Sequence, residues 1–199
     1  MNYLAHALLA GPQAEHRLGG LLGDFVKGPL LAAGEEFGEG VLLGIRLHRR
    51  IDSFADAHPA FRRSRQRVSA QRRRYSGIIV DLFYDHFLAA HWSRFSGETL
   101  EEFTAAVYAL LGQHCLPTRL ARLLPRMQHD DWLAGYRQPA AIARALDGIA
   151  ARRLRRANTL GGAGSELLRD YDGFEQDFLE FFPDATAFAE DFRQQQRDP

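Results

Sequence analysis

The stretch Gly-Ile-Arg-Leu-His-Arg-Arg-Ile-Asp, residues 44–52, decides the fold class. Its apolar residues recur at the spacing of an α-helix with one buried face. His48 and Asp52 are four residues apart and therefore share that face. A second stretch, Ile-Ile-Val-Asp-Leu-Phe-Tyr-Asp-His at residues 78–86, has the same arrangement, with Asp81 and Asp85 on its apolar face and His86 at the flank. Burying such polar groups is costly unless something pairs with them, so two helices with this pattern predict a shared polar partner.

The rest of the chain shows the same helical periodicity, and strand-like alternation is scarce. We expect helices at about Asn2–Ala10, Glu15–Lys27, Glu36–Ala57, Phe61–Gln66, Tyr75–Ser93, Leu100–Gln113, Pro117–His129, Trp132–Gln138, Pro139–Arg155 and Glu166–Gln195. Glycine and proline pairs lie where several of these helices end. The sequence therefore predicts one all-α domain over residues 1–199, a bundle of about eight to ten helices, with the aromatic residues of the C-terminal helix packed back onto it.

Composition limits the classes of protein to consider. The chain has 199 residues, of which 46% are hydrophobic, enough for one sizeable core. Cys115 is the only cysteine, so an internal disulfide is excluded and a reducing compartment is favoured. The N-terminus lacks the basic region of a signal peptide, and no apolar run approaches the length of a membrane helix. We therefore expect a cytoplasmic protein without a membrane partner.

Charge is balanced overall but uneven along the chain. The 25 basic and 25 acidic residues give a formal net charge of zero, yet no acidic residue occurs between Ala57 and Val80. That segment contains seven arginines: Arg62, Arg63, Arg65, Arg67, Arg72, Arg73 and Arg74. Such an excess suits an anionic partner, either a phosphate group or an acidic protein surface. A solvated helix face is the competing interpretation for each arginine.

The buried polar groups of the two stretches have two interpretations. One is a divalent metal held by imidazole and carboxylate ligands, for which Mn²⁺, Mg²⁺, Fe²⁺ and Zn²⁺ are suitable. The other is a buried hydrogen-bonded network without metal. A metal site of this kind polarises phosphoryl oxygens and activates water. Arg46, Arg49 and Arg50 flank His48 and suit phosphate binding, although salt bridges to the acidic C-terminal segment would also explain them.

Asp24 and His6 are weaker candidates on spacing alone. Asp24 lies between Gly23 and Gly28, where glycines permit the close approach of a backbone or a substrate, but plain helix packing explains them equally well. His6 lies on a short apolar helix, four residues after Asn2, and such a histidine is more often a core residue than a ligand. The segment is not a phosphate-binding loop, and no serine or cysteine nucleophile motif is present.

Together these residues resemble the acyl carrier protein phosphodiesterase family. The blocks that carry the resemblance are Met-Asn-Tyr-Leu-Ala-His at 1–6, Gly-Asp-Phe-Val-Lys-Gly at 23–28, the stretch at 44–52, Asp-Leu-Phe-Tyr-Asp-His-Phe-Leu-Ala-Ala-His-Trp at 81–92 and Trp-Leu-Ala-Gly-Tyr-Arg at 132–137. The resemblance implies a helical, divergent and permuted relative of the HD-domain metal phosphohydrolases. It also implies a divalent metal, typically Mn²⁺, with Mg²⁺ or Fe²⁺ as alternatives.

The implied reaction removes 4′-phosphopantetheine from the serine of holo-acyl carrier protein by attack of metal-activated water. Asp24, His48 and Asp52 are then the expected catalytic residues. The metal ligands are expected among Asp24, His48, Asp52, Asp81, Asp85, His86 and His6. Because carrier proteins are acidic, the seven arginines of residues 62–74 become the expected docking surface. The alternative is a phosphohydrolase for a small phosphodiester or nucleotide. A nucleic-acid-binding module is disfavoured by the zero net charge.

Overall fold

The computed structural model describes residues 1–30, 37–153 and 158–196, and every regular element in these ranges is a helix. The α-helices are α1 (Tyr3–Leu9), α2 (Ala14–Leu22), α4 (Glu39–Ala57), α5 (Pro59–Arg67), α6 (Ser76–Ala90), α7 (Leu100–Gly112), α8 (Thr118–His129), α9 (Trp132–Gly135), α10 (Pro139–Arg153), α11 (Gly164–Arg169) and α12 (Tyr171–Gln195). Two short 3₁₀ helices, η1 (Ala70–Tyr75) and η2 (Trp92–Arg94), complete the described elements. The prediction of an all-α fold is confirmed.

The predicted helices differ from the observed ones most at two places, while α6 and α9 each end three residues before their predicted ends. Helix α2 stops at Leu22, five residues before its predicted end, because the amides of Phe25 and Val26 both turn back to the carbonyl of Leu22. The predicted C-terminal helix is divided into α11 and α12 at Asp170, whose φ of −144° and ψ of 50° are not helical. The predicted boundaries at Glu36 and Arg155 lie outside the described residues.

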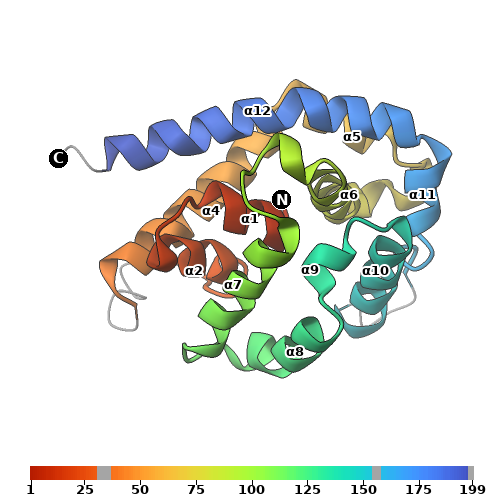
Figure 1. Cartoon of the computed structure of the whole chain (residues 1–199). Helices are drawn as coiled ribbons and strands as arrows, with labels where there is room; N and C mark the ends of the chain where they lie inside the picture. Colours follow the sequence, from red (N-terminus) through yellow and green to blue (C-terminus); the bar gives the residue numbers. More distant parts are fainter. Residues whose placement is uncertain (31–36, 154–157, 197–199) are drawn as a thin grey trace.

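Helix α6 forms the centre of the bundle, and α12 lies along one side of it, over α4, α5 and α6 (Figure 1). The aromatic rings of α12 pack inward: Phe174 lies 5.0 Å from Phe83, and Phe178 lies 5.4 Å from Tyr84, measured between ring centroids. All four of these rings are completely buried. Burying one phenylalanine side chain contributes about 1.5–3 kcal/mol, so α12 is an integral part of the core, as predicted.

Helices α2 and α4 are almost in backbone contact. A Cβ atom on Gly19 would lie 2.1 Å from the carbonyl oxygen of Val41, and one on Gly44 would lie 2.2 Å from that of His16. Only glycine allows so close an approach at both positions. This contact fixes the following turns of α4, which carry His48 and Asp52, beneath the end of α2 and beside α1.

No helix in the described ranges is long and apolar enough to cross a membrane.

Candidate functional site

Three residues of the N-terminal half converge on one point. His6 comes from α1, and His48 and Asp52 come from successive turns of α4. His6 Nε2 lies 3.2 Å from Asp52 Oδ1, and His48 Nε2 lies 3.3 Å from Asp52 Oδ2. The two imidazole rings stack with their centroids 3.7 Å apart. Each residue offers one ligand atom, and these three atoms lie within 4.8 Å of one another, close enough to bind one metal ion.

The backbone orients His48 for ligation. Its Nδ1 lies 2.8 Å from the carbonyl oxygen of Gly20, which can only accept, so the ring hydrogen is on Nδ1. The Nε2 lone pair is then directed at the carboxylate of Asp52. Two electron-rich atoms facing each other at 3.3 Å are stabilised when a cation lies between them.

The environment of His6 also favours a bound cation. It is 2% exposed, and within the described ranges neither of its ring nitrogens makes a hydrogen bond of normal geometry. Burial, reinforced by the neighbouring His48, lowers the pKa of His6 to about 4, so its ring is neutral and free to donate a lone pair. A buried, unpartnered imidazole is costly, and coordination to a metal would remove that cost. These residues therefore fit a divalent metal ion.

The surroundings of Asp52 favour positive charge. The α-ammonium of Met1 lies 3.1 Å from Asp52 Oδ1 and 2.8 Å from Asp81 Oδ1. Although burial opposes it, the attraction of these two carboxylates raises the pKa of the ammonium to about 11. Burial likewise opposes ionisation of Asp52, but its close contacts with His48 and His6 and with the nearby ammonium of Met1 hold its pKa well below the usual range. The side chain of Asp52 is 42% exposed, so an ion from solvent can reach it.

Asp24 and Asp81 lie next to this cluster. Burial raises the pKa of Asp81, and the negative charges of Asp52 and Asp24 both add to that increase. Asp24 lies in the turn after α2 rather than on a helix, and it lines a cavity of about 440 Å³. The structure therefore brings Asp24, Asp52 and Asp81 into one acidic neighbourhood, and Asp24 also lines the cavity.

Asp85 and His86, predicted as ligands, have other partners. Asp85 is completely buried and accepts the backbone amides of Leu4 and Ala5 at 2.9 and 3.0 Å, so it caps the start of α1. His86 lies 2.8 Å from the carbonyl oxygen of Tyr136 through Nδ1 and 2.9 Å from the hydroxyl of Tyr171 through Nε2. The structure does not bring either side chain into the cluster. Asp85 instead holds α1, and with it His6, in place.

The arginines that flank His48 either contact the backbone or are exposed to solvent. Arg49 donates to the carbonyl oxygens of Val26 and Gly28 at 2.8 and 2.9 Å, and so ties the segment after Asp24 to α4. Arg46 and Arg50 are exposed on the outer face of α4. Phosphate binding by Arg46, Arg49 and Arg50 stays a prediction.

The arginine-rich segment of residues 62–74 is largely engaged with the C-terminal part of the chain. Asp177, on α12, accepts Arg63 and Arg67 at 3.0 and 2.7 Å and is 2% exposed. Arg72 pairs with Glu166 at 3.1 Å. Arg63 also pairs with Glu180, and Arg67 pairs with Asp170 at 2.8 Å. The other arginines contact nearer groups: Arg62 the carbonyl of Asp56, Arg65 the side chains of Asp56 and Ser76, Arg73 the carbonyls of Val68 and Gln66, and Arg74 the ring of Tyr75. Docking by this segment stays a prediction, and much of its charge is already neutralised.

Sequence reasoning missed two features of the site. One is the contact of the Met1 ammonium with Asp52 and Asp81, which depends on residues about 50 and 80 positions away. The other is the cavity beside Asp24, whose far wall is built by α8, α9 and α10. Its only signal in the sequence was the block at residues 132–137, which contains Trp132 and Tyr136.

Comparison with known proteins shows the family of the chain. The family model described as "Acyl carrier protein phosphodiesterase" matches residues 1–185. A protein of that name from Serratia proteamaculans (strain 568) is 36% identical over 194 residues, covering 96% of this chain and 98% of its own length. One from Escherichia coli O139:H28 is also 36% identical over 194 residues, covering 95% and 97%. No solved structure matches the chain. The chain belongs to the acyl carrier protein phosphodiesterase family.

Proposed function

We propose that this protein hydrolyses the phosphodiester that joins 4′-phosphopantetheine to the serine of holo-acyl carrier protein, releasing apo-carrier protein and free 4′-phosphopantetheine. The observation that carries the proposal is the His6–His48–Asp52 cluster beside Asp24, in a chain that matches the family along nearly its whole length. Hydrolysis of a phosphodiester requires an activated water and stabilisation of charge on the phosphoryl oxygens, and both fit an imidazole–carboxylate metal site.

We propose a divalent metal, Mn²⁺ first and Mg²⁺ or Fe²⁺ as alternatives, held by His6, His48 and Asp52. When bound, such an ion supplies Lewis-acid polarisation of a phosphoryl oxygen and lowers the pKa of water. The chain's own contribution is to orient the ligands. Gly20 fixes the ring hydrogen of His48 on Nδ1, and the cap that Asp85 provides for α1 fixes His6.

We propose that Asp24 transfers protons in the reaction. It is half-buried, it borders both the acidic neighbourhood and the cavity, and it is not one of the three clustered ligands. A carboxylate at that border can accept a proton from the attacking water or donate one to the departing serine oxygen. Asp81 contributes negative charge next to Asp52 and thereby strengthens the attraction of the site for a cation.

The acidic carrier protein is the proposed partner, and a cytoplasmic location is proposed with it, because Cys115 is the only cysteine in the sequence. Neither nucleic acid nor a membrane is part of the proposal.

Metal-stripped protein incubated with holo-acyl carrier protein, with and without Mn²⁺, tests the function by the mass of the carrier. We expect metal-dependent loss of the phosphopantetheine arm, abolished in Asp24→Ala and retained in Arg94→Gln, a change at an exposed position on η2. If a folded, Mn²⁺-loaded protein leaves the carrier intact but cleaves a small phosphodiester, the alternative reaction replaces this one.

A further inference from the structure

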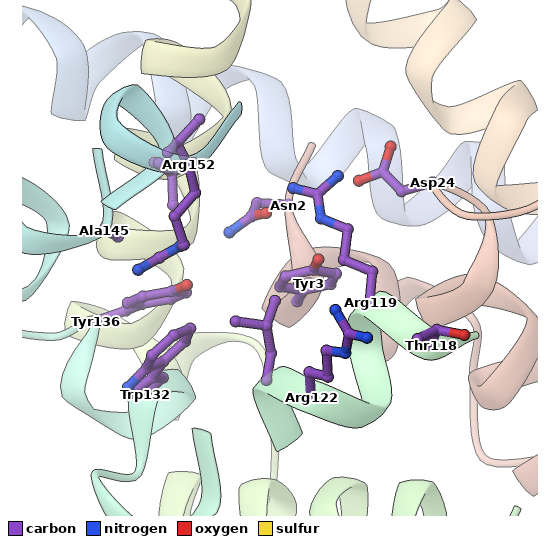
Figure 2. Close-up of a pocket in the computed structure, with 13 residues that line it drawn as sticks. Asn2, Tyr3, Asp24, Thr118, Arg119, Arg122, Trp132, Tyr136, Ala145 and Arg152 are labelled. Atoms are coloured by element: carbon purple, nitrogen blue, oxygen red, sulfur yellow. The ribbon is translucent and has the colours of Figure 1, made fainter. Parts of the chain in front are cut away.

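The cavity beside Asp24 combines apolar side chains with arginines. Tyr3, Trp132 and Tyr136 contribute aromatic rings, and Leu123 and Ile149 contribute aliphatic side chains. Arginines stand around this apolar interior: Figure 2 shows Arg119 and Arg122 extending from α8 on one side, with Arg152 of α10 on the other. Cation and apolar surface are thus combined in one pocket of about 440 Å³, a size typical of sites for small molecules.

Two of these arginines have no ionic partner among the described residues. Within the described ranges, Arg122 and Arg152 make no ion pair, in contrast to Arg63, Arg67 and Arg72 of the arginine-rich segment. Arg152 is held close to its own helix: a Cβ on Gly148 would lie 2.4 Å from its Nη2 atom, so the glycine makes room for the guanidinium. Unpaired guanidinium groups beside an apolar pocket favour a ligand that carries an anionic group.

The cavity adjoins the proposed catalytic site. Asp24 belongs to both, and Asn2 and Leu82, which also line the cavity, are the chain neighbours of Met1 and Asp81. A ligand in the cavity therefore has one end beside the acidic cluster, while its remainder lies against Trp132 and Tyr136.

We propose that this cavity binds the 4′-phosphopantetheine arm of the substrate, with Arg122 and Arg152 as binding residues for its anionic end and the aromatic wall against its chain. The proposal rests on the proposed function, because that function supplies the ligand. The arm is long and flexible and ends in a phosphate, which matches a pocket with apolar walls and cationic flanks.

Direct binding tests the cavity without relying on turnover. Metal-stripped full-length protein is titrated by calorimetry with free 4′-phosphopantetheine, with pantetheine and with inorganic phosphate. We expect saturable binding of 4′-phosphopantetheine and weaker binding of each fragment. Loss of a charge-assisted hydrogen bond weakens binding by about tenfold, so Arg122→Gln and Arg152→Gln are each expected to raise the Kd for 4′-phosphopantetheine by about that factor. Arg94→Gln is the matched control and should leave it unchanged.

Two further variants test the position of the Arg152 guanidinium and the contribution of the aromatic wall. Gly148→Ala keeps every charge but displaces the guanidinium of Arg152, and it should weaken binding of 4′-phosphopantetheine and leave that of pantetheine almost unchanged. Trp132→Ala removes part of the aromatic wall and should weaken binding of both.

The binding experiment and the hydrolysis assay can fail independently of each other. If 4′-phosphopantetheine does not bind, or binds equally well to Arg122→Gln, Arg152→Gln and the native protein, the cavity is not the arm site, even if the enzyme processes holo-acyl carrier protein. An equal loss in Arg94→Gln would show a general charge effect and would also overturn the proposal. Cavity-dependent binding by a protein that leaves holo-acyl carrier protein intact would uphold the cavity and refute the reaction.

Discussion

Substitution of Gly23 by alanine tests whether His48 must occupy its observed position. Gly23 follows the last residue of α2 with φ −52° and ψ −36°, so its backbone accepts alanine without strain. A Cβ atom there would lie 2.2 Å from Cγ of His48 and 2.4 Å from its Cδ2. Carbon atoms pack at about 3.5–4.0 Å, so the imidazole must retreat by about 1 Å or more.

The displacement lowers stability moderately and has a large effect on the site. Overpacking of this kind costs about 1–3 kcal/mol of stability. The shifted ring would lose its 2.8 Å hydrogen bond to Gly20 and the alignment of Nε2 with Asp52. Disturbing the partner that orients a histidine ligand typically lowers metal affinity 10–100-fold, and a 1 Å misplacement lowers turnover by about 10²-fold.

The assay combines Mn²⁺ calorimetry, thermal unfolding and removal of the arm from holo-acyl carrier protein. Gly112→Ala is the matched control, because Gly112 ends α7 and a Cβ there would meet nothing within 4 Å. We expect a folded Gly23→Ala protein with Mn²⁺ affinity at least about tenfold weaker and kcat/KM lower by about 10²-fold. A Gly23→Ala protein that binds Mn²⁺ as tightly as the native protein would refute the assignment of His48 as a ligand.

Three further predictions concern the metal and the charged contacts of α11 and α12. At Mn²⁺ concentrations 100 times the Kd, the Tm of the native protein should rise by roughly 5–10 °C, and differential scanning calorimetry should show no such rise for His6→Ala. Asp177→Ala removes a buried carboxylate that accepts Ser64, Arg63 and Arg67, and should lower the free energy of unfolding in urea by about 2–3 kcal/mol. Asp191→Ala, exposed on the same helix, should change it by less than about 0.5 kcal/mol. For Glu166, burial raises the pKa, but hydrogen bonds from Ser69, Arg169 and Arg72 outweigh it and lower the pKa from 4.5 to about 2. The stabilising contribution of Glu166 is therefore complete above pH 4.5 and is lost as the pH falls towards 2. Across that window the free energy of unfolding of the native protein should fall by about 3 kcal/mol more than that of Glu166→Gln. Equal decreases in the two proteins during acid denaturation would contradict this.

The helical fold was predictable because periodicity is a local property, whereas the roles of individual polar groups were not. Asp52 and Asp85 occupy equivalent positions on apolar helical faces, and sequence spacing treats them alike. Their difference comes from distant partners: Asp85 receives two backbone amides from α1, 80 residues away, while Asp52 faces two imidazoles. A buried carboxylate is satisfied by either environment, so only the tertiary contacts distinguish a helix cap from a candidate ligand.

The roles of the arginines likewise depend on tertiary contacts that the sequence does not indicate. The run at residues 62–74 looked like a docking surface because no acidic residue lies nearby in sequence. Its partners, Glu166, Asp170 and Asp177, are about a hundred residues away and approach only when α11 and α12 fold against α5 and η1. Conversely, Arg152 belongs to a basic cluster in the sequence with Arg153, Arg155 and Arg156, but neither that cluster nor Arg122 indicates a cavity there. The location of Arg122 and Arg152 at a cavity depends on how α8 and α10 pack.

The electrostatics of the site explain why the metal and the cavity belong to one mechanism. Asp24, Asp52 and Asp81 form an acidic neighbourhood, which repels a phosphodiester anion unless a cation is bound there. The Met1 ammonium offsets only part of this charge, since two carboxylates share it. The arginines of the cavity attract the same anion, so a metal-free protein should still bind 4′-phosphopantetheine but hold its phosphate away from the cluster. Adding Mn²⁺ should therefore tighten that binding. Asp52→Asn, which weakens the metal site, should abolish the increase, while metal-free binding is retained or becomes tighter because one repelling charge is lost. Binding of 4′-phosphopantetheine that is indifferent to Mn²⁺ in the native protein would separate the two sites and contradict this coupling.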